Sequence, residues 1–556
     1  MQKGVCDSMK GKLLALAKAA VFLCLGAVIF WKVQDILIPN WTTTEYKVER
    51  LDQKRLPTFD VLFLGPSHVH SGISPMELYR DYEICSLNLG TMGQPMGVSC
   101  FLLERAYDNY SFEVVFLDVG CLFLTDNMYG GQDMNNRWRS VLDSLAPGSL
   151  KYSMAKDYAE NSWSDGFLSA MLPLFTYHTN WTALTAASFH PSGAARDYDL
   201  GQDIYSKTVP AAAHYTPENI DYATNYIHNF HSGKMTEAVD GIVTTKTIEE
   251  DLDTTSIPDE NLEYLLKIAN LCKAHGTKLV LFKVPTMRPP QWYASAWTRV
   301  KSGFVSQIAQ QYGLEFWDLQ FDADIGLSRA DTFDGGVHLN SIGAEKVSNY
   351  IGARIMEEQL VTPKADPIYD KYLRKYQKVF SVVQLQTTGS FYEYLDFLKK
   401  QGENWTVLIA ASDDYMLGAT DEDLEALREF GLPVATSGEF RDSYIGIVSE
   451  GKTMYEAVSD YKLEHRAQIA GNNVSMVSKN GWILNPGRSI RVNGIERSMA
   501  GTGLNFVIYD NETGCVLDSV VIDNSAQRNL TRNQNVTQAF LSSYEAALCA
   551  EGSASK

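Results

Sequence analysis

A serine stands where an open α/β sheet would hold a nucleophile. The apolar run Val61–Leu64 is typical of a buried strand. Gly65 and Pro66 follow it and predict a tight turn, so Ser67 comes directly after the strand's carboxyl end. Because open α/β sheets gather their chemistry at that edge, the sequence predicts Ser67 as a nucleophile that forms a covalent ester. The alternative is a turn serine that caps the next helix.

A base and an acid for this serine occur far along the chain. The segment Asp334-Gly-Gly-Val-His338 supplies an imidazole with a carboxylate just before it. We expect His338 to take the Ser67 proton and Asp334 to fix the imidazole tautomer. Asp331 is an alternative carboxylate. His and Cys residues do not cluster at ligand spacing, so no metal site and no cofactor are expected.

Strand and helix patterns alternate around these motifs, which predicts a parallel sheet in an α/β fold. The expected strands are 61–64, 84–89, 114–119, 279–284 and 315–318, and the expected helices are 75–81, 98–107, 261–274, 300–312 and 344–358. The interval from about 125 to 250 is rich in Tyr, Trp, Asn and His and is expected to be an insertion that covers the sheet edge. A structural subdomain without substrate contact is the alternative.

The N-terminus predicts a membrane anchor. Residues 13–33 are almost all apolar, long enough to cross a bilayer as a helix, and interrupted only by Lys18 before the exit. Lysines in residues 1–12 predict a cytoplasmic N-terminus, so the rest of the chain is expected outside the cell, after a stalk at 34–58. A cleaved signal peptide is the alternative.

Length and charge bound the possible functions. The chain has 556 residues, which is too long for one ordinary domain, and its formal net charge is −19. Nucleic-acid binding needs a basic footprint and is therefore not expected.

A second compact region is expected after a linker or boundary helix at 361–378. It spans 379–530 and is β-rich, with expected strands at 379–386, 405–411, 444–448, 504–509 and 516–522 and expected helices at 392–401 and 421–430. Asn511-Glu-Thr-Gly514 predicts a hairpin turn between the last two strands. The tail 531–556 is expected to be mobile.

Three segments resemble the SGNH (GDSL-type) hydrolases. They are Gly65-Pro66-Ser67, then Asn88-Leu-Gly90-Thr-Met-Gly93-Gln94, and finally Asp334 to His338 with the following Leu-Asn-Ser-Ile-Gly. Together with residues 172–184, they are most similar to membrane-anchored SGNH proteins of Gram-positive bacteria. That group includes proteins that act with membrane-bound O-acyltransferases in D-alanylation of lipoteichoic acid. The resemblance covers about residues 35–360 and implies a flavodoxin-like three-layer sheet over 59–360.

The resemblance also implies roles for individual residues. The backbone N–H groups of Ser67 and Gly90 would face the developing oxyanion, and Asn88 or Gln94 would add a side-chain donor. His68 and His70 flank Ser67 and are expected to line the substrate pocket together with Gln94; a role as ligand or base is the alternative for the two histidines. The implied activity is an extracytoplasmic O-acyl, notably O-acetyl, transfer or ester hydrolysis on a cell-surface glycan, with a membrane-bound O-acyltransferase as a partner.

Three departures from the SGNH pattern support a different function. Pro66 replaces the usual Asp, the third block reads Asp118-Val-Gly120-Cys121 without its Asn, and three residues rather than two separate Asp334 from His338. The alternative function is a non-catalytic surface-glycan binding or assembly factor. Residues 405–414, 421–430 and 503–514 resemble the interleukin-like EMT inducer domain in permuted order, which implies a sandwich domain that binds carbohydrate.

Overall fold

A computed structural model of the chain describes most of its residues. These are 2–38, 48, 51, 59–123, 131–184, 257–286, 295–327, 331, 338–480, 487–525, 528–533 and 535–536. They form two compact units. The first contains the described residues up to 184, 257–327 and 344–372, and the second contains 331, 338–343 and those from 373 onward.

The first unit is built around a five-stranded parallel sheet. Its strands are β1 (Val61–Leu64), β2 (Ser86–Asn88), β3 (Val114–Asp118), β4 (Lys278–Lys283) and β5 (Glu315–Asp318). The order β2-β1-β3-β4-β5 is that of flavodoxin-like doubly wound sheets. β1 and β3 are buried along their whole length because both faces of the sheet are covered. All five expected strands are confirmed, each within two residues of its expected ends.

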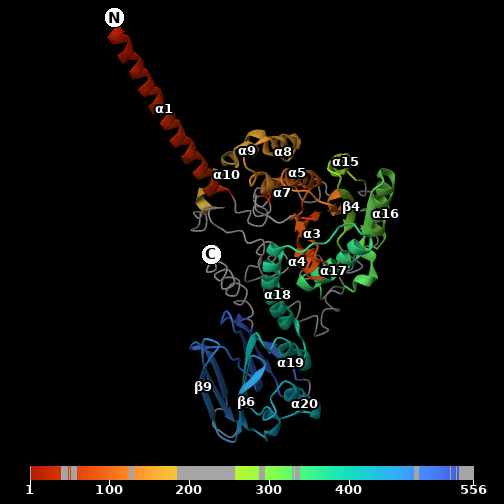
Figure 1. The fold of residues 1–556 in the computed structure, drawn as a ribbon, viewed down its shortest axis with the longest axis vertical. Helices are drawn as coiled ribbons and strands as arrows, with labels where there is room; N and C mark the ends of the chain where they lie inside the picture. Colours follow the sequence, from red (N-terminus) through yellow and green to blue (C-terminus); the bar gives the residue numbers. More distant parts are fainter. Residues whose placement is uncertain are drawn as a thin grey trace. The chain divides into compact units, whose positions relative to one another are not determined.

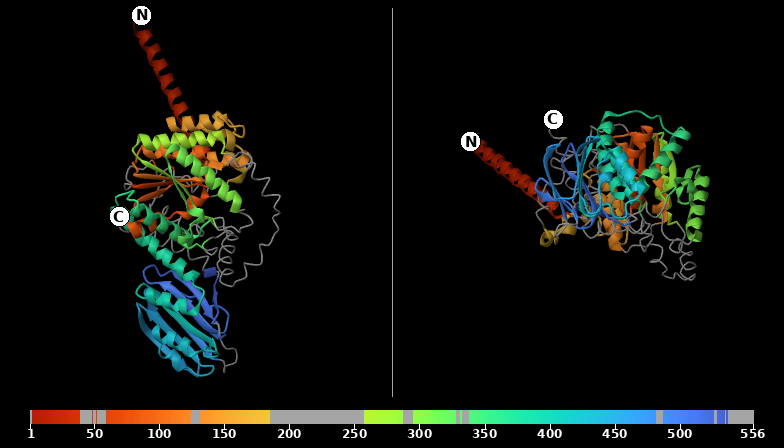
Figure 2. Two further views of the ribbon diagram at one scale, coloured as in Figure 1. Left: turned by 90° about the vertical axis from the view of Figure 1, so that its right-hand side faces the viewer. Right: turned by 90° about the horizontal axis from the view of Figure 1, so that it is seen from below.

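Helices cover both sides of this sheet (Figures 1 and 2). They are α3 (Ser67–Gly72), α4 (Pro75–Tyr82), α5 (Met96–Tyr107), α15 (Asp259–Ala274), α16 (Ser295–Tyr312) and α17 (Ser341–Glu357). Ser74 caps α4 by accepting from the Glu77 backbone N–H, and its own N–H donates to Ser348 Oγ of α17 at 2.7 Å. α4 and α17 therefore pack together although they are far apart in the sequence.

The N-terminal helix α1 spans Gln2–Leu37. Among the described residues, it is the one helix long and apolar enough to cross a membrane, over the 24 residues from Leu14 to Leu37. The expected stalk begins too early at residue 34, because the helix continues through Leu37. Gln34 and Leu37 are buried there against a later helical segment. Most of the remaining stalk lies outside the described residues.

The described part of the expected insertion is helical. α7 (Gly131–Leu142), α8 (Ser149–Glu160), α9 (Phe167–Met171) and α10 (Leu174–Tyr177) follow β3 and the short helix η1 (Val119–Phe123), and end with η2 (Asn180–Ala183). Residues 185–256 lie outside the described residues.

The second unit is a curled β-sheet. Its central strand β6 (Trp405–Asp413) pairs with β13 (Gly503–Asp510) and β7 (Ser443–Ser449), and its last residues pair with β10 (Asn472–Asn480). The other strands are β8 (Lys452–Ser459), β9 (Leu463–Ile469), β11 (Gly487–Val492), β12 (Ile495–Glu496), β14 (Val516–Ile522) and β15 (Leu530–Arg532). The helices are α19 (Phe391–Lys400) and α20 (Asp421–Glu429).

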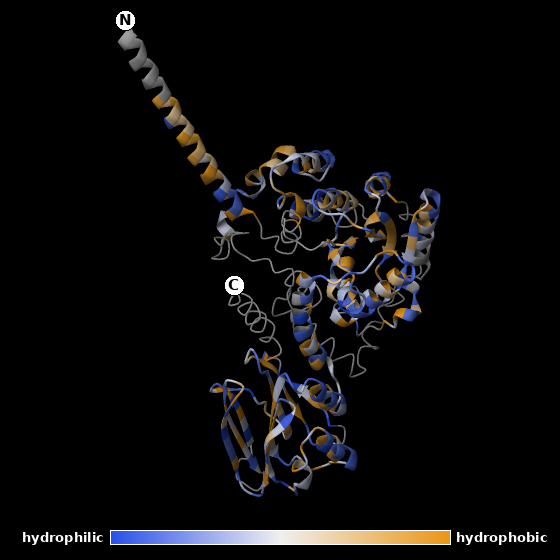
Figure 3. Ribbon diagram, in the orientation of Figure 1, coloured by the Kyte–Doolittle hydropathy of each residue, from blue (hydrophilic) through white to orange (hydrophobic). Residues whose placement is uncertain are grey.

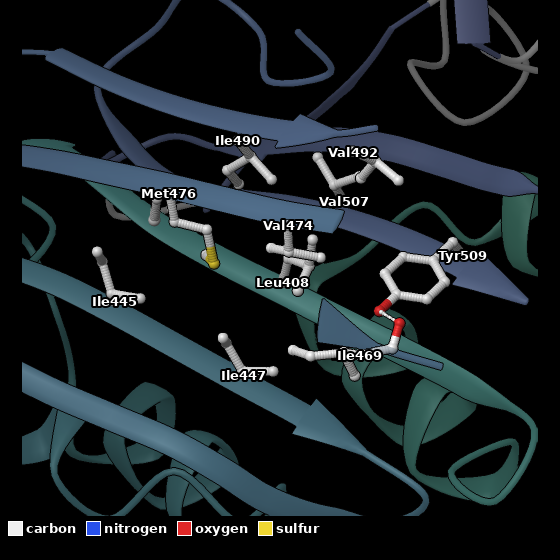
Figure 4. Packing of buried hydrophobic residues seen from close by; sticks show 11 residues of the cluster. Leu408, Ile445, Ile447, Ile469, Val474, Met476, Ile490, Val492, Val507 and Tyr509 are labelled. Atoms are coloured by element: carbon white, nitrogen blue, oxygen red, sulfur yellow. Dashed lines mark hydrogen bonds between the residues drawn. The ribbon is translucent and has the colours of Figure 1, made fainter. Parts of the chain in front are cut away.

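An apolar cluster fills the curl of this sheet. Leu408 of β6, Ile445 and Ile447 of β7, and Val474 and Met476 of β10 all point into it (Figure 4). The Tyr509 hydroxyl closes one end by donating to the Ile469 carbonyl at 3.1 Å. The expected hairpin is confirmed, because β13 and β14 are antiparallel neighbours and Gly514 takes a positive φ of 70°.

The expected strand at 379–386 is wrong, because α18 (Pro367–Thr387) runs through it. The β-branched run Val379 to Val383 favoured a strand. However, Tyr369, Tyr376 and Phe380 are buried at helical spacing along one stripe, and that packing overrides local propensity. Residues 367–378, within the expected linker or boundary helix, form the first part of α18.

Candidate active site

The turn that carries Ser67 leaves no room for side chains. Gly65 has a φ of +150°, and a Cβ atom there would lie 2.6 Å from Val69 Cγ2 and 2.7 Å from Asp118 Cβ. Pro66 precedes α3, and Ser67 is the first residue of that helix, partly exposed at the carboxyl end of β1. The strand, the glycine and the proline therefore place Ser67 just beyond the carboxyl end of β1.

The Gln94 side chain is hydrogen-bonded to this turn. Its Oε1 accepts from the Gly65 N–H at 3.0 Å and from Ser99 Oγ at 2.7 Å. Its Nε2 donates to the Leu89 carbonyl at 2.8 Å and to Thr91 Oγ1 at 3.1 Å. The side chain is fully buried, so these four bonds use its whole amide within the protein. The structure thus gives Gln94 a bracing role, and its expected contact with substrate stays a prediction.

Asn88 braces the same region from the end of β2. Its Nδ2 donates to the carbonyls of Val69 and Ile73, at 2.8 and 3.0 Å, and both donors of the amide are then used. Its Oδ1 accepts from the Gly90 N–H at 2.9 Å. The two expected oxyanion donors are therefore bonded to the protein itself. Gly90 also packs tightly, since a Cβ there would lie 2.7 Å from the His70 backbone nitrogen.

The predicted histidines differ in how far they are buried. His68 is half-buried on α3, whereas His70 on the same helix is only 5% exposed. His338 is partly exposed and belongs to the segment that groups with the second unit, while Ser67 belongs to the first. Their pairing therefore stays a prediction.

Of the two candidate acids, the structure describes Asp331 but not Asp334, which lies outside the described residues. Asp331 is buried, and its carbonyl accepts from the Asn340 N–H at 2.9 Å. That backbone bond places Asp331 close in space to the residues that follow His338, and the choice of acid stays a prediction.

A buried carboxylate and a lysine, neither predicted, lie next to the Ser67 turn. Asp118 ends β3, and its oxygens accept from the backbone N–H groups of Gly120 at 2.7 Å and Val284 at 2.8 Å. Lys283 ends β4, and its Nζ lies 3.7 Å from Asp118 Oδ2. That distance permits an ion pair but is too long for a hydrogen bond.

Lys283 also lies close to the residue before Ser67. A Cβ atom on Gly120 would lie 3.6 Å from both Lys283 Nζ and Pro66 Cγ, so the ammonium and the proline flank the same spot. The Lys283 side chain is 17% exposed. The site thus contains a cation, Lys283, that forms no hydrogen bond with Asp118. The strand pattern of the sequence does not predict a lysine at this place.

A cavity of about 210 Å³ opens beside the start of α5. Its aromatic wall consists of Trp138, Trp163 and Tyr264. Gly97 is required there, because a Cβ would lie 2.6 Å from the Trp138 ring and 3.0 Å from the Tyr264 ring. Pro95 also lines the cavity and directly follows Gln94, so the cavity adjoins the loop that braces the Ser67 turn.

Comparison with known proteins gives distant likenesses among solved structures only. No family model matches the chain, and no curated protein matches it. Among solved structures, the chain is similar to a protein described as a "putative acylhydrolase" from Bacteroides fragilis NCTC 9343. The two share 12% sequence identity, the match covers 56% of this chain and 95% of that chain, and the TM-score is 0.25.

Proposed function

We propose that this protein is a serine-dependent O-acyl transferase or esterase that uses Ser67 as its nucleophile. The observation that carries the proposal is the position of Ser67, after a glycine turn at the carboxyl end of the buried strand β1. Buried amides of Gln94 and Asn88 hold that turn rigid. A rigid support of this kind keeps a reacting oxygen in place, which reduces the entropy lost on reaching the transition state.

The proposed reaction has two halves. Ser67 Oγ attacks the acyl carbonyl, its proton passes to His338, and the carbon–oxygen bond to the donor breaks as His338 protonates the leaving oxygen. A sugar hydroxyl or water then attacks the acyl-serine, gives its proton to His338, and releases Ser67 when the proton returns. Asp331 or Asp334 orients the imidazole. The acceptor class is a cell-surface polysaccharide, and the acyl group is acetyl.

Lys283 supplies positive charge in this scheme. Asn88 and the Gly90 N–H are bonded within the protein, so the oxyanion needs another donor besides the Ser67 backbone. The Lys283 ammonium lies at the neighbouring strand end, beside Pro66. Loss of one oxyanion donor typically lowers the rate by ~10²–10³, so this charge accounts for a large part of the proposed rate enhancement.

The location and partners of the protein belong to the proposal as well. α1 would anchor the chain as a single membrane pass, with residues after it outside the cell. A membrane-bound O-acyltransferase would supply the acyl donor. The cavity lined by Trp138, Trp163 and Tyr264 would hold a sugar ring or a short acyl chain near the turn.

A fluorophosphonate probe tests the nucleophile directly, using the full chain in lipid nanodiscs. We expect labelling of the parent protein and none of Ser67→Ala. Ser71→Ala is the matched control, since Ser71 lies on the same short helix and its hydroxyl only donates to the Ser67 carbonyl at 2.8 Å. Equal labelling of the parent and Ser67→Ala would sink the catalytic proposal.

A non-catalytic glycan-binding or assembly factor is the second candidate. It is favoured by the bonding of Asn88 and Gly90, which leaves the expected oxyanion donors engaged. It predicts binding on a glycan array that persists in Ser67→Ala, together with no turnover of acyl esters by the parent protein. Measurable turnover that depends on Ser67 would exclude it.

A further inference from the structure

The C-terminal end of α1 packs against the helical insertion of the first unit. Gln34 Oε1 accepts from the Leu174 N–H at 3.3 Å, and Asn180 Nδ2 donates to the Leu37 carbonyl at 3.0 Å. Gln34 is 2% exposed in this contact. α10 and η2 therefore lie at the end of the apolar helix, where a membrane-crossing segment would leave the bilayer (Figures 1 and 2).

Large apolar side chains are exposed on these same helices. Phe175 of α10 is 54% exposed, Trp181 of η2 is 67% exposed, and Leu168 of α9 is 56% exposed. Tyr152 of α8 and Phe167 of α9 are also exposed and touch edge to face, with ring centroids 5.3 Å apart. We call these five residues the apolar face. Such a group on an ordinary water-facing surface is unusual and indicates contact with something apolar.

Composition separates this segment from the rest of the chain. Residues 167–184 include no Asp, Glu, Lys or Arg, although charged residues make up 21% of the whole sequence. Tryptophan and tyrosine are enriched where proteins meet the headgroup region of a bilayer, because their rings are apolar and their N–H or O–H groups are polar. Figure 3 shows apolar residues along much of α1 and again on the helices beside its end.

The face is held in place by buried polar contacts behind it. Arg139 of α7 is fully buried and pairs with Asp143 at 2.9 Å. Its Nη1 donates to the Ser169 carbonyl of α9 at 2.8 Å, and the Tyr177 hydroxyl of α10 donates to Asp143 Oδ2 at 2.8 Å. α7, α9 and α10 are thus tied to one ion pair, so the apolar side chains are displayed by a fixed scaffold.

We propose that the apolar face inserts into the headgroup layer of the membrane that α1 crosses. The continuity with α1 favours lipid as the occupant, because a helix that leaves the bilayer at Leu37 brings its packed neighbours to the bilayer surface. Partial insertion of aromatic and aliphatic side chains removes their apolar area from water, which stabilises this placement. The helix α1 and the apolar face together would then fix the orientation of the first unit at the membrane, whereas α1 alone would leave the unit free to rotate.

Quenching by lipid-attached nitroxides tests this proposal on the full chain in phosphatidylcholine nanodiscs. A fluorescent NBD label is attached at Phe175→Cys, after Cys6, Cys24, Cys515 and Cys549 are replaced by alanine; the other four cysteines are buried. The control label is at Phe304→Cys, because Phe304 is 40% exposed on α16, at the far side of the same unit from α1 (Figure 1).

We expect phosphatidylcholine with a nitroxide near its headgroup to remove emission from the label at position 175 and to leave that at position 304 unchanged. Equal emission at position 175 with and without the nitroxide would overturn the proposal and assign the face to a protein partner. Both substituted positions are exposed, so neither variant should disturb folding.

Discussion

Asp118 in the first unit and Asp518 in the second are both fully buried, and their cations differ. Asp518 lies 3.4 Å from Arg532, which is 3% exposed and also donates to the Leu385 carbonyl and Thr388 Oγ1. Asp118 is satisfied by two backbone N–H groups, and its lysine lies 3.7 Å away with part of its side chain exposed. One cation is locked inside a structural network, whereas the other lies at a strand end with its side chain 17% exposed.

This difference separates a cation held in a buried network from a cation at a strand end. Burial raises the pKa of the Asp518 carboxyl, and Arg532 opposes that shift. The Tyr394 hydroxyl donates to the same carboxylate at 3.1 Å. Asp518, Tyr394 and Arg532 are thus held against one another inside the second unit. At Lys283 the cation is not part of such a network, because Asp118 accepts its hydrogen bonds from two backbone N–H groups instead.

The largest effect is expected from Arg532→Met. The substitution leaves a buried carboxylate without its cation, which typically costs about 3–5 kcal/mol. We expect a strong fall in the thermal midpoint of the second unit, together with fast hydrogen exchange in β14, where Asp518 lies.

Lys400→Met is the matched control in the same unit. Lys400 and Asp396 form an exposed pair at 2.7 Å, which is worth at most about 0.5 kcal/mol. If Arg532→Met and Lys400→Met lower the midpoint equally, Arg532 is no more important for stability than an exposed lysine, and the contrast with Lys283 is wrong.

Lys283→Met tests the available cation. We expect kcat/KM for an acyl ester to fall by ~10², mainly through kcat, because the charge acts on the transition state. The thermal midpoint should change little, since Asp118 keeps both backbone bonds. Lys283→Arg should recover part of the activity.

Lys278→Met provides the control on the same strand. Lys278 stands at the opposite end of β4, is 41% exposed and pairs with Glu315 at 2.5 Å. It should leave kcat/KM unchanged. A Lys283→Met enzyme with full activity would show that the lysine only neutralises Asp118, whereas Ser67 labelling would still stand as a separate result.

The sequence predicted the parallel sheet well because its strands are short continuous apolar runs. Such runs occur where both faces of a sheet are covered, and β1 is an example. The strands from β8 to β12 were not predicted. β8 and β9 read Lys-Thr-Met-Tyr-Glu-Ala-Val-Ser and Leu-Glu-His-Arg-Ala-Gln-Ile, and their residues are mostly half-exposed, so little apolar signal marks them.

Part of the candidate site could be predicted in the same way. Ser67 follows from local chemistry, because a glycine and a proline after a strand define its turn. The bracing role of Gln94 could not be predicted, since its four bonds depend on how the loop after β2 folds back on Gly65. Lys283 meets Asp118 only because β3 and β4 are neighbours in the sheet, which a single sequence does not reveal.

Lys151 sharpens the comparison from a third position. It is 3% exposed on α8, its Nζ donates to the Leu145 carbonyl at 3.1 Å, and burial lowers its pKa, although Asp143 opposes the shift. Because the folded pKa lies below the unfolded value, the charged lysine destabilises the fold at neutral pH. That penalty disappears as the pH rises through the folded pKa towards the unfolded value. We therefore expect Lys151→Met to raise the free energy of unfolding by about 1 kcal/mol or less, and to raise the thermal midpoint slightly.

The pH dependence of that difference is the decisive measurement. The gap between Lys151→Met and the parent protein should be widest near neutral pH and should close as the pH approaches the ordinary lysine value of 10.5. A gap that stays constant would mean that packing rather than charge separates the two proteins. A gap that closes would instead distinguish three charges among the described residues: Arg532 locked in a network, Lys283 at a strand end, and Lys151 tolerated at a small cost.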